Sequence, residues 1–147
     1  MRPIIHVLRT LFLCGVILVS SCGEKEPDAV CSTNTQSKSN GTQACGTSKV
    51  VNYSKSGNEE TVRLQIAGGY EVTMYKVDAF QEGTEYTPYS MSYTNANRNI
   101  SNSLTFVKFD RTAKIISVKY RFENEVTVGI DGTAVIVDEG QATDLAY

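Results

Sequence analysis

The feature that most constrains the fold is the alternation of apolar and polar residues in the segment KIISVKYRFE, residues 114–123. A period of two places every second side chain on the same face of an extended chain. The apolar set is Ile116, Val118, Tyr120 and Phe122. The segment therefore predicts an antiparallel β-strand that covers a core with one face and meets solvent with the other.

Similar segments on both sides of this strand predict an all-β domain of about eight antiparallel strands. TVRLQI (61–66) alternates in the same way, and Asp131-Gly132 between apolar runs is typical of a tight hairpin. The expected strands are 49–53, 61–66, 70–77, 89–93, 104–109, 114–123, 125–130 and 133–137. The last four would form a meander, with a turn between Glu123 and Glu125.

Two architectures suit such a series of strands: a two-layer sandwich or partly open barrel, or a closed lipocalin-like barrel. Lipocalin-like domains usually open on a Gly-x-Trp motif, and this chain has no tryptophan. The segment LTFVKF (104–109) is also apolar on both faces and needs cover on both. We therefore expect the sandwich or partly open barrel, with the closed barrel as the alternative.

The alternating phase of adjoining strands also predicts the core. A shift of one residue would expose a whole apolar set, so the phase is strongly constrained. The expected core residues are Val62, Leu64, Ile66, Ile116, Val118, Tyr120, Phe122, Val126, Val128 and Ile130.

The N-terminal 22 residues have the order of an export signal. Arg2 and Arg9 precede a run of nine uncharged residues, LFLCGVILV, which is too short to span a bilayer. The following VSSC, ending at Cys22, resembles the lipobox of bacterial lipoprotein precursors. The resemblance implies cleavage after residue 21 and lipidation of Cys22 by diacylglycerol and a further acyl chain such as palmitate. Several chains give a stable membrane anchor.

The composition of the remaining chain excludes several functions. Without Arg2, Arg9 and His6, 16 acidic residues face 12 basic ones, which gives a formal charge of −4. Nucleic-acid binders instead show clustered Lys and Arg. His6 is the sole histidine, so the mature protein would have no histidine base and no histidine metal ligand. We expect no nucleic-acid partner, metal or cofactor.

Cys31 and Cys45 would remain as a pair in an oxidising compartment, which favours a disulfide. Two unpaired thiols, or a redox or metal site without CxxC spacing, are the alternatives. Residues 22–47 otherwise have few large apolar residues and predict a polar tether. A single β domain would then span residues 48–147, and reduction of the disulfide would loosen the tether more than it unfolds the domain.

Gly23 follows Cys22. Among the lipoproteins that the chain resembles, a residue other than Asp at this position suggests that the protein is anchored in the outer membrane. The acidic and basic residues of 24–26 mark export to the cell surface in some bacterial groups. We expect a lipid-anchored envelope protein on either the periplasmic or the surface side.

The segment EYTPYSMSYTNANRNISNS (85–103) is the best candidate for ligand binding, because Tyr and Asn on an exposed loop are typical of adaptable recognition surfaces. The candidate residues are Tyr86, Tyr89, Tyr93, Asn95, Asn97, Arg98 and Asn99, with Asn102 beside them. The alternative is a half-buried strand whose tyrosines point inward, followed by a solvated loop. The partner would be an envelope protein or a glycan.

Acidic residues offer weaker candidates. DEGQATD (138–144) could supply oxygen ligands to calcium, although an exposed turn and tail is favoured. Glu123 and Glu125 could act as a glycosidase pair, but solvent-facing carboxylates are favoured. We therefore expect a non-catalytic, lipid-anchored, extracytoplasmic binding or structural module. A small hydrophobic-ligand carrier is the alternative.

Overall fold

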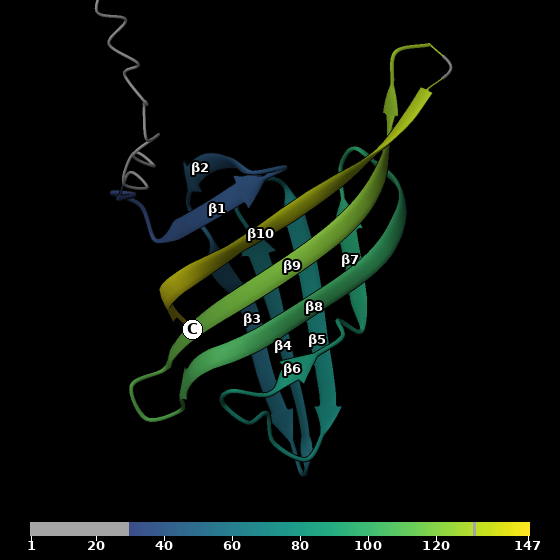
Figure 1. Ribbon diagram of the computed structural model, residues 1–147. Coiled ribbons are helices and arrows are strands. Elements are labelled where there is room, and N and C mark those ends of the chain that lie inside the picture. Colours follow the sequence, from purple (N-terminus) through teal and green to yellow (C-terminus); the bar gives the residue numbers. More distant parts are fainter. Residues whose placement is uncertain (1–29, 131) are drawn as a thin grey trace, which may run out of the picture.

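A computed structural model describes residues 30–130 and 132–147, which form two stacked antiparallel sheets (Figure 1). The lipobox segment with Cys22 and residue Asp131 lie outside the described residues. The six-stranded sheet contains, in spatial order, β2 (Thr42–Gly46), β1 (Thr35–Ser39), β10 (Gly132–Ala146), β9 (Ile115–Val128), β8 (Ala96–Asp110) and β6 (Glu85–Tyr86). The four-stranded sheet contains β3 (Lys49–Ser56), β4 (Glu59–Ile66), β5 (Tyr70–Val77) and β7 (Ser90–Tyr93).

The all-β prediction is confirmed, and the two open sheets correspond to a sandwich rather than a closed barrel. The long strands β8, β9 and β10 run diagonally across the shorter strands β3, β4 and β5 (Figure 1). Aromatic side chains fill the space between the layers. Phe106 packs against Phe80 and Phe109 at ring distances of 4.8 and 4.9 Å, and Phe122 packs against Tyr70 at 4.9 Å.

The alternation that predicted the core is confirmed for eight of the ten expected residues. The expected side chains of β4, the four of residues 114–123 and Val126 are all buried. Val128 and Ile130 are instead 53% and 96% exposed. The pairing of β8 with β9 ends at Ala96 and Val126, so the tip of the β9–β10 hairpin projects beyond both sheets (Figure 1). The alternation of apolar and polar residues continues in this tip, but neither sheet covers the apolar side chains there.

The final part of the chain has three long strands where four shorter ones were expected. β9 continues through Asn124 without the turn that was expected between Glu123 and Glu125. Asn124 is completely buried, and its Nδ2 donates to the hydroxyl of Tyr70 (3.1 Å). A polar residue with a partner in the opposite sheet therefore occupies a core position and interrupts the apolar pattern but not the strand.

β10 also extends further than expected. Residues 138–144 were expected as an exposed turn and tail, but residues 138–142 pair with both β9 and β1. A bulge lies between Ala142 and Leu145, where Asp144 has a φ of 52°.

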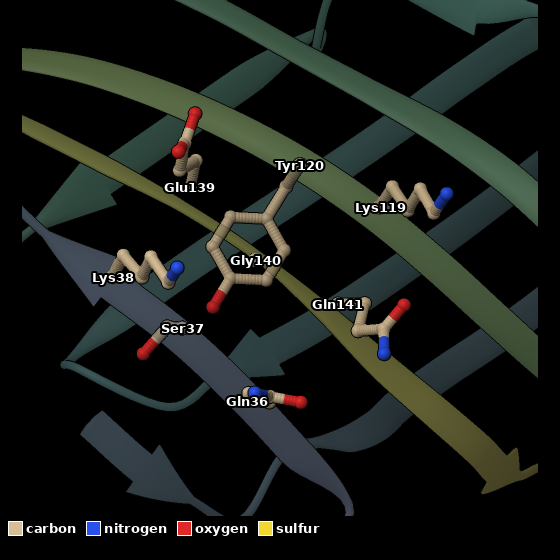
Figure 2. A pocket seen from close by; sticks show the side chains of 8 residues that line it. All are labelled: Gln36, Ser37, Lys38, Lys119, Tyr120, Glu139, Gly140 and Gln141. Carbon is tan, nitrogen blue, oxygen red and sulfur yellow. The ribbon is translucent and has the colours of Figure 1, made fainter. Parts of the chain in front are cut away.

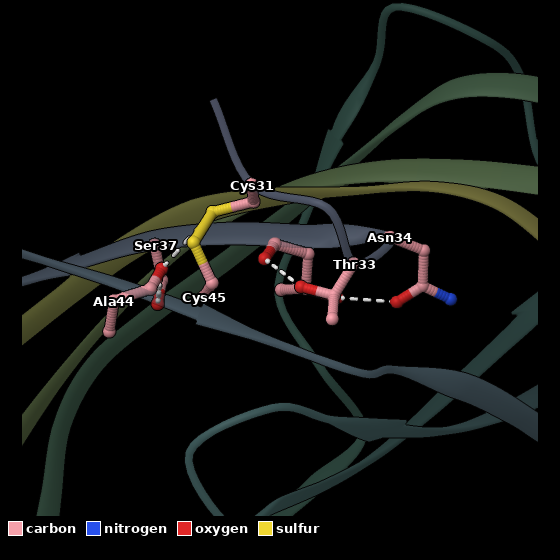
Figure 3. Close-up of a disulfide and its surroundings, with 7 residues drawn as sticks. Cys31, Thr33, Asn34, Ser37, Ala44 and Cys45 are labelled. Carbon is pink, nitrogen blue, oxygen red and sulfur yellow. Dashed lines mark hydrogen bonds between the residues drawn. A yellow bond between two sulfur atoms is a disulfide. The ribbon is translucent and has the colours of Figure 1, made fainter. Parts of the chain in front are cut away.

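The second half of the expected tether belongs to the domain. β1 and β2 form a hairpin, and β1 pairs with β10 along its whole length. The predicted disulfide between Cys31 and Cys45 is confirmed and closes the open end of this hairpin, with a Cα–Cα distance of 5.5 Å (Figure 3). The folded domain thus begins near residue 31 and not at residue 48.

Hydrogen bonds replace apolar burial at the start of this hairpin. Asn34 Nδ2 donates to the Ser48 carbonyl, and the Ser48 amide donates to Asn34 Oδ1, both at 2.8 Å. The buried Thr35 hydroxyl donates to Ser48 Oγ at 2.7 Å. Because short polar side chains hold β1 in place, its sequence carries little apolar signal.

β8 is irregular along its pairing with β9. Register shifts occur between Ala96 and Arg98, between Asn99 and Ser101, and between Phe106 and Lys108. Each shift places an extra residue on β8, which bends the strand and increases its twist. The neighbouring strand β6 pairs with β8 at two positions.

Candidate functional site

The three candidate tyrosines do not lie on one surface. Tyr86 and Tyr93 are partly buried and pack against the core, where Tyr93 stacks on Tyr70 at 4.5 Å and Tyr86 meets Phe80 edge-on at 5.3 Å. Tyr89 is 75% exposed. The inward alternative therefore holds for Tyr86 and Tyr93, and the recognition hypothesis keeps Tyr89.

The expected Asn-rich loop is largely a strand. Asn95 lies in a turn, and β8 begins at the next residue, so Asn97, Arg98 and Asn99 are exposed residues of β8. Asn97 Nδ2 donates to the Thr127 hydroxyl (2.6 Å), and Asn99 Nδ2 donates to the Met91 carbonyl (3.1 Å). These amides help to fix β8 against its neighbours. The loop expectation was wrong because pairing with β9 orders a segment whose composition is typical of a loop.

A second exposed ring lies beside Tyr89. Tyr75 on β5 is 41% exposed, and its ring centroid lies 5.7 Å from that of Tyr89, with 58° between the ring planes. Val72 and Met74 of the same strand are buried, so the alternation directs Tyr75 to the outer face. We call Tyr75 and Tyr89 the tyrosine pair. Tyr75 was not predicted from sequence, although it occupies a polar, outward position in the alternation of YEVTMYKV (70–77).

A shallow depression of about 340 Å³ adjoins the tyrosine pair on the outer face of the four-stranded sheet. Thr73 lies two residues before Tyr75 on β5 and pairs with Ser90, the residue after Tyr89. The lining residues are Arg63, Glu71, Thr73, Ser90, Met91 and Ser92. We call the tyrosine pair and this depression together the tyrosine face.

The two charged residues that line the depression are paired with each other. Arg63 Nη2 lies 2.8 Å from Glu71 Oε2, and both side chains are half-exposed. A hydrogen bond to Glu59 raises the pKa of the Tyr75 hydroxyl. The face therefore presents two rings, several hydroxyl groups and a neutral ion pair.

Another depression, of about 380 Å³, lies over β1, β10 and β9 (Figure 2). The Tyr120 ring lies across Gly140 and directs its hydroxyl toward Ser37 (Figure 2). A Cβ at position 140 would lie 2.5 Å from the Gln36 carbonyl oxygen and 2.8 Å from the Tyr120 hydroxyl. Glycine thus permits the close approach of β1, β10 and this ring. Charges of both signs, from Lys38, Lys119 and Glu139, line the depression.

The most strongly bound charge is Glu60 of β4, whose side chain is completely buried. Arg111, in the turn between β8 and β9, donates from Nε to Glu60 Oε1 (2.9 Å) and from Nη2 to Oε2 (2.8 Å). The Tyr53 hydroxyl donates to Oε1 (3.0 Å), and the Phe80 amide donates to Oε2 (2.8 Å). Four donors occupy the acceptor sites of this carboxylate. Glu60 is therefore suited to a structural role, in which it joins the sheets.

The pKa of Glu60 reflects two opposing effects. Burial alone raises it, but the hydrogen bonds from Arg111, Phe80 and Tyr53 outweigh burial and lower the pKa to about 2. The carboxylate is therefore ionised at neutral pH. A general acid that works at neutral pH needs a raised pKa, which is the opposite of the shift at Glu60.

A second polar link joins the sheets near their other end. The Tyr70 hydroxyl donates to Asp138 of β10 and accepts a hydrogen bond from Asn124 of β9. Burial, followed by the hydrogen bond to Asp138, raises the pKa of Tyr70 far above its usual value. This side chain therefore stays protonated as a donor to Asp138.

The other acidic candidates point to different partners. Asp138 binds Tyr70, Asp144 lies 3.7 Å from Lys108, and Glu123 lies 2.5 Å from Arg121. Within residues 30–130 and 132–147, no three His, Cys, Asp or Glu side chains come together as a metal site would require. The carboxylates proposed for calcium thus do not converge on one point.

Comparisons with protein-family models, with curated proteins and with solved structures give no match for this chain. The part of the chain that the structure describes has no helix long and apolar enough to cross a membrane.

Proposed function

We propose that this chain is a lipid-anchored, extracytoplasmic binding module of a bacterial cell envelope, with no catalytic role. The observation that carries the proposal is the order of charged segment, apolar run and VSSC at residues 1–22. The lipids on Cys22 would hold the protein in the outer membrane. The disulfide between Cys31 and Cys45 supports an oxidising compartment.

The distance between anchor and domain adds a constraint. Eight residues lie between Cys22 and Cys31 in the sequence, so the nine steps of an extended chain reach about 30 Å. The sandwich would therefore remain close to the lipid headgroups. A binding module at this distance would act on ligands within the envelope.

Two features support binding rather than catalysis or internal ligand transport. Glu60, whose pKa is lowered to about 2, is saturated by donors, whereas the tyrosine pair is exposed to solvent. The sheets are open at their edges and aromatic rings fill the space between them. A lipocalin-like carrier would require a closed barrel around a cavity.

The anchor can be tested by detergent phase partition of the full chain expressed in a bacterial host. Wild-type protein should enter the detergent phase and incorporate labelled palmitate, and Cys22→Ser should do neither. Cys14→Ser is the matched control, because it removes a cysteine from the apolar run and should leave partition unchanged. Aqueous partition of the wild type, or equal labelling of wild type and Cys22→Ser, would contradict lipidation.

A further inference from the structure

We propose that the tyrosine face binds a neutral glycan of the cell envelope. This inference rests on the proposed function and names the class of ligand. It follows from the exposed rings of Tyr75 and Tyr89, the adjoining depression of about 340 Å³, and the pairing of Arg63 with Glu71.

The tyrosine pair supplies apolar contact area for a sugar ring. The face of an aromatic ring is electronegative and attracts the weakly positive C–H groups that a pyranose presents on its own face. Tyr89 and Tyr75 are 75% and 41% exposed, so their rings are accessible without rearrangement of the core. The 58° between the rings suits a puckered sugar chain better than a flat base stack.

The backbone that carries the rings is restricted before a ligand arrives. Tyr75 belongs to the paired part of the sheet, opposite Thr61 of β4. Tyr89 follows Pro88, whose fixed φ restricts the backbone, and precedes β7. A site with little freedom to lose on binding gains affinity from pre-organisation.

The depression supplies hydrogen-bonding groups around the rings. The hydroxyls of Thr73, Ser90 and Ser92 line it beside the charged pair of Arg63 and Glu71. Hydroxyl and planar charged groups match the alternating donors and acceptors of a sugar. Since the two charges neutralise each other at 2.8 Å, the face favours a neutral ligand over a phosphate or an acidic peptide.

A protein partner fits this surface less well. The core of a protein interface is apolar and buries about 800 Å² on each partner. Around the tyrosine pair the lining is mainly polar. The exposed apolar residues Val128, Ile130 and Val135 lie instead in the β9–β10 hairpin region, away from this face, and nothing in the structure shows what covers them.

Affinity electrophoresis of the full chain in non-ionic detergent tests the inference. Native gels would contain mannan, dextran or xylan as neutral probes, and heparin as the anionic probe. At least one neutral gel should retard the wild type. The double variant Tyr75→Ala/Tyr89→Ala should lose at least tenfold in apparent affinity, and Tyr89→Phe should retain binding because the ring face remains.

The control is Val107→Ala, which shortens a comparably exposed side chain on β8 and should migrate like the wild type. Circular dichroism melts of all variants would verify folding. The inference is overturned if no neutral gel retards the wild type, if heparin alone does so, or if the double variant is folded and equally retarded. Retardation of Cys22→Ser measures glycan binding separately from lipid anchoring, so either proposal can fail alone.

Discussion

Glu60 illustrates at the scale of one residue how this protein tolerates a buried charge. A carboxylate removed from water is costly unless it is paired and fully hydrogen-bonded. Arg111, Tyr53 and the Phe80 amide meet that requirement, and the Arg111 guanidinium also lies 4.3 Å from the centroid of the Phe109 ring. The cluster is therefore stable as a unit and sensitive to the loss of any member.

Arg111→Ala should lower the free energy of unfolding by about 2–4 kcal/mol, because it leaves a buried carboxylate without its cation. The value lies below that of a fully buried pair because the Arg111 side chain is 37% exposed. Lys108→Ala is the control, since Lys108 and Asp144 are 3.7 Å apart and well exposed, and it should change stability by less than about 1 kcal/mol. Urea denaturation measures both. Equal losses would refute the structural role of Glu60.

The lowered pKa of Glu60 predicts an acid limb in the stability curve. A group with a folded pKa of about 2 and an ordinary value of 4.5 stabilises the fold above about pH 4.5. That stability should disappear as the pH falls toward 2. Urea midpoints measured from pH 7 to pH 2 should therefore fall less steeply in Glu60→Gln than in the wild type.

Glu71→Gln is the control for this titration, because it removes one half-exposed carboxylate and should retain the steep acid limb. If Glu60→Gln and the wild type show the same slope below pH 5, the carboxylate does not stabilise the fold through its ionised form.

At the scale of elements, the sequence predicts those strands whose order depends on apolar burial. β4, β5 and the first part of β9 show their inner face directly in the alternation. β1 shows no such pattern, because its inner positions hold Thr35 and Ser37, which hydrogen bonds and the close approach of Gly140 accommodate. Whether such a strand forms depends on partners that are distant in the sequence and not on its own composition.

The end of β9 permits a matched test of this difference. Val118→Ala should cost about 1–3 kcal/mol, because the side chain is completely buried. Val128→Ala makes the same chemical change on the same strand and in the same alternating phase, but its side chain is 53% exposed. We expect a loss within about 0.5 kcal/mol there. Similar losses in thermal or urea unfolding would show that the hairpin tip is covered.

At the scale of the whole molecule, contacts between distant segments join the two layers. Glu60 and Arg111 are 51 residues apart, and Tyr70 and Asp138 are 68 residues apart. No local pattern marks either pair, so neither could be predicted from sequence. The tyrosine face likewise combines β4, β5 and β7. Of its two rings, Tyr89 was predicted from sequence and Tyr75 was not, although the outward phase of Tyr75 in β5 was visible.

Because β1 belongs to the large sheet, its disulfide should stabilise the entire domain. In the chain-entropy model, closing a loop of this length contributes about 3 kcal/mol. The double variant Cys31→Ser/Cys45→Ser should therefore shift a single unfolding transition to lower urea concentration. This reverses the sequence-based expectation that reduction would mainly loosen a tether. A separate early transition, with the main one unmoved, would restore that expectation.

The bulges of β8 have a consequence for the lipid-anchored protein that we propose. Lipid-anchored molecules diffuse in two dimensions and collide far more often than the same number in solution. A long, flat strand at the edge of a sheet would invite neighbouring copies to pair with it and polymerise. β6 pairs with the outer side of β8 at two positions, and the three register shifts of β8 bend the strand, so its backbone groups do not form a straight template. On the proposed anchor, the bulged strand would thus favour a dense layer of separate molecules over a fibre.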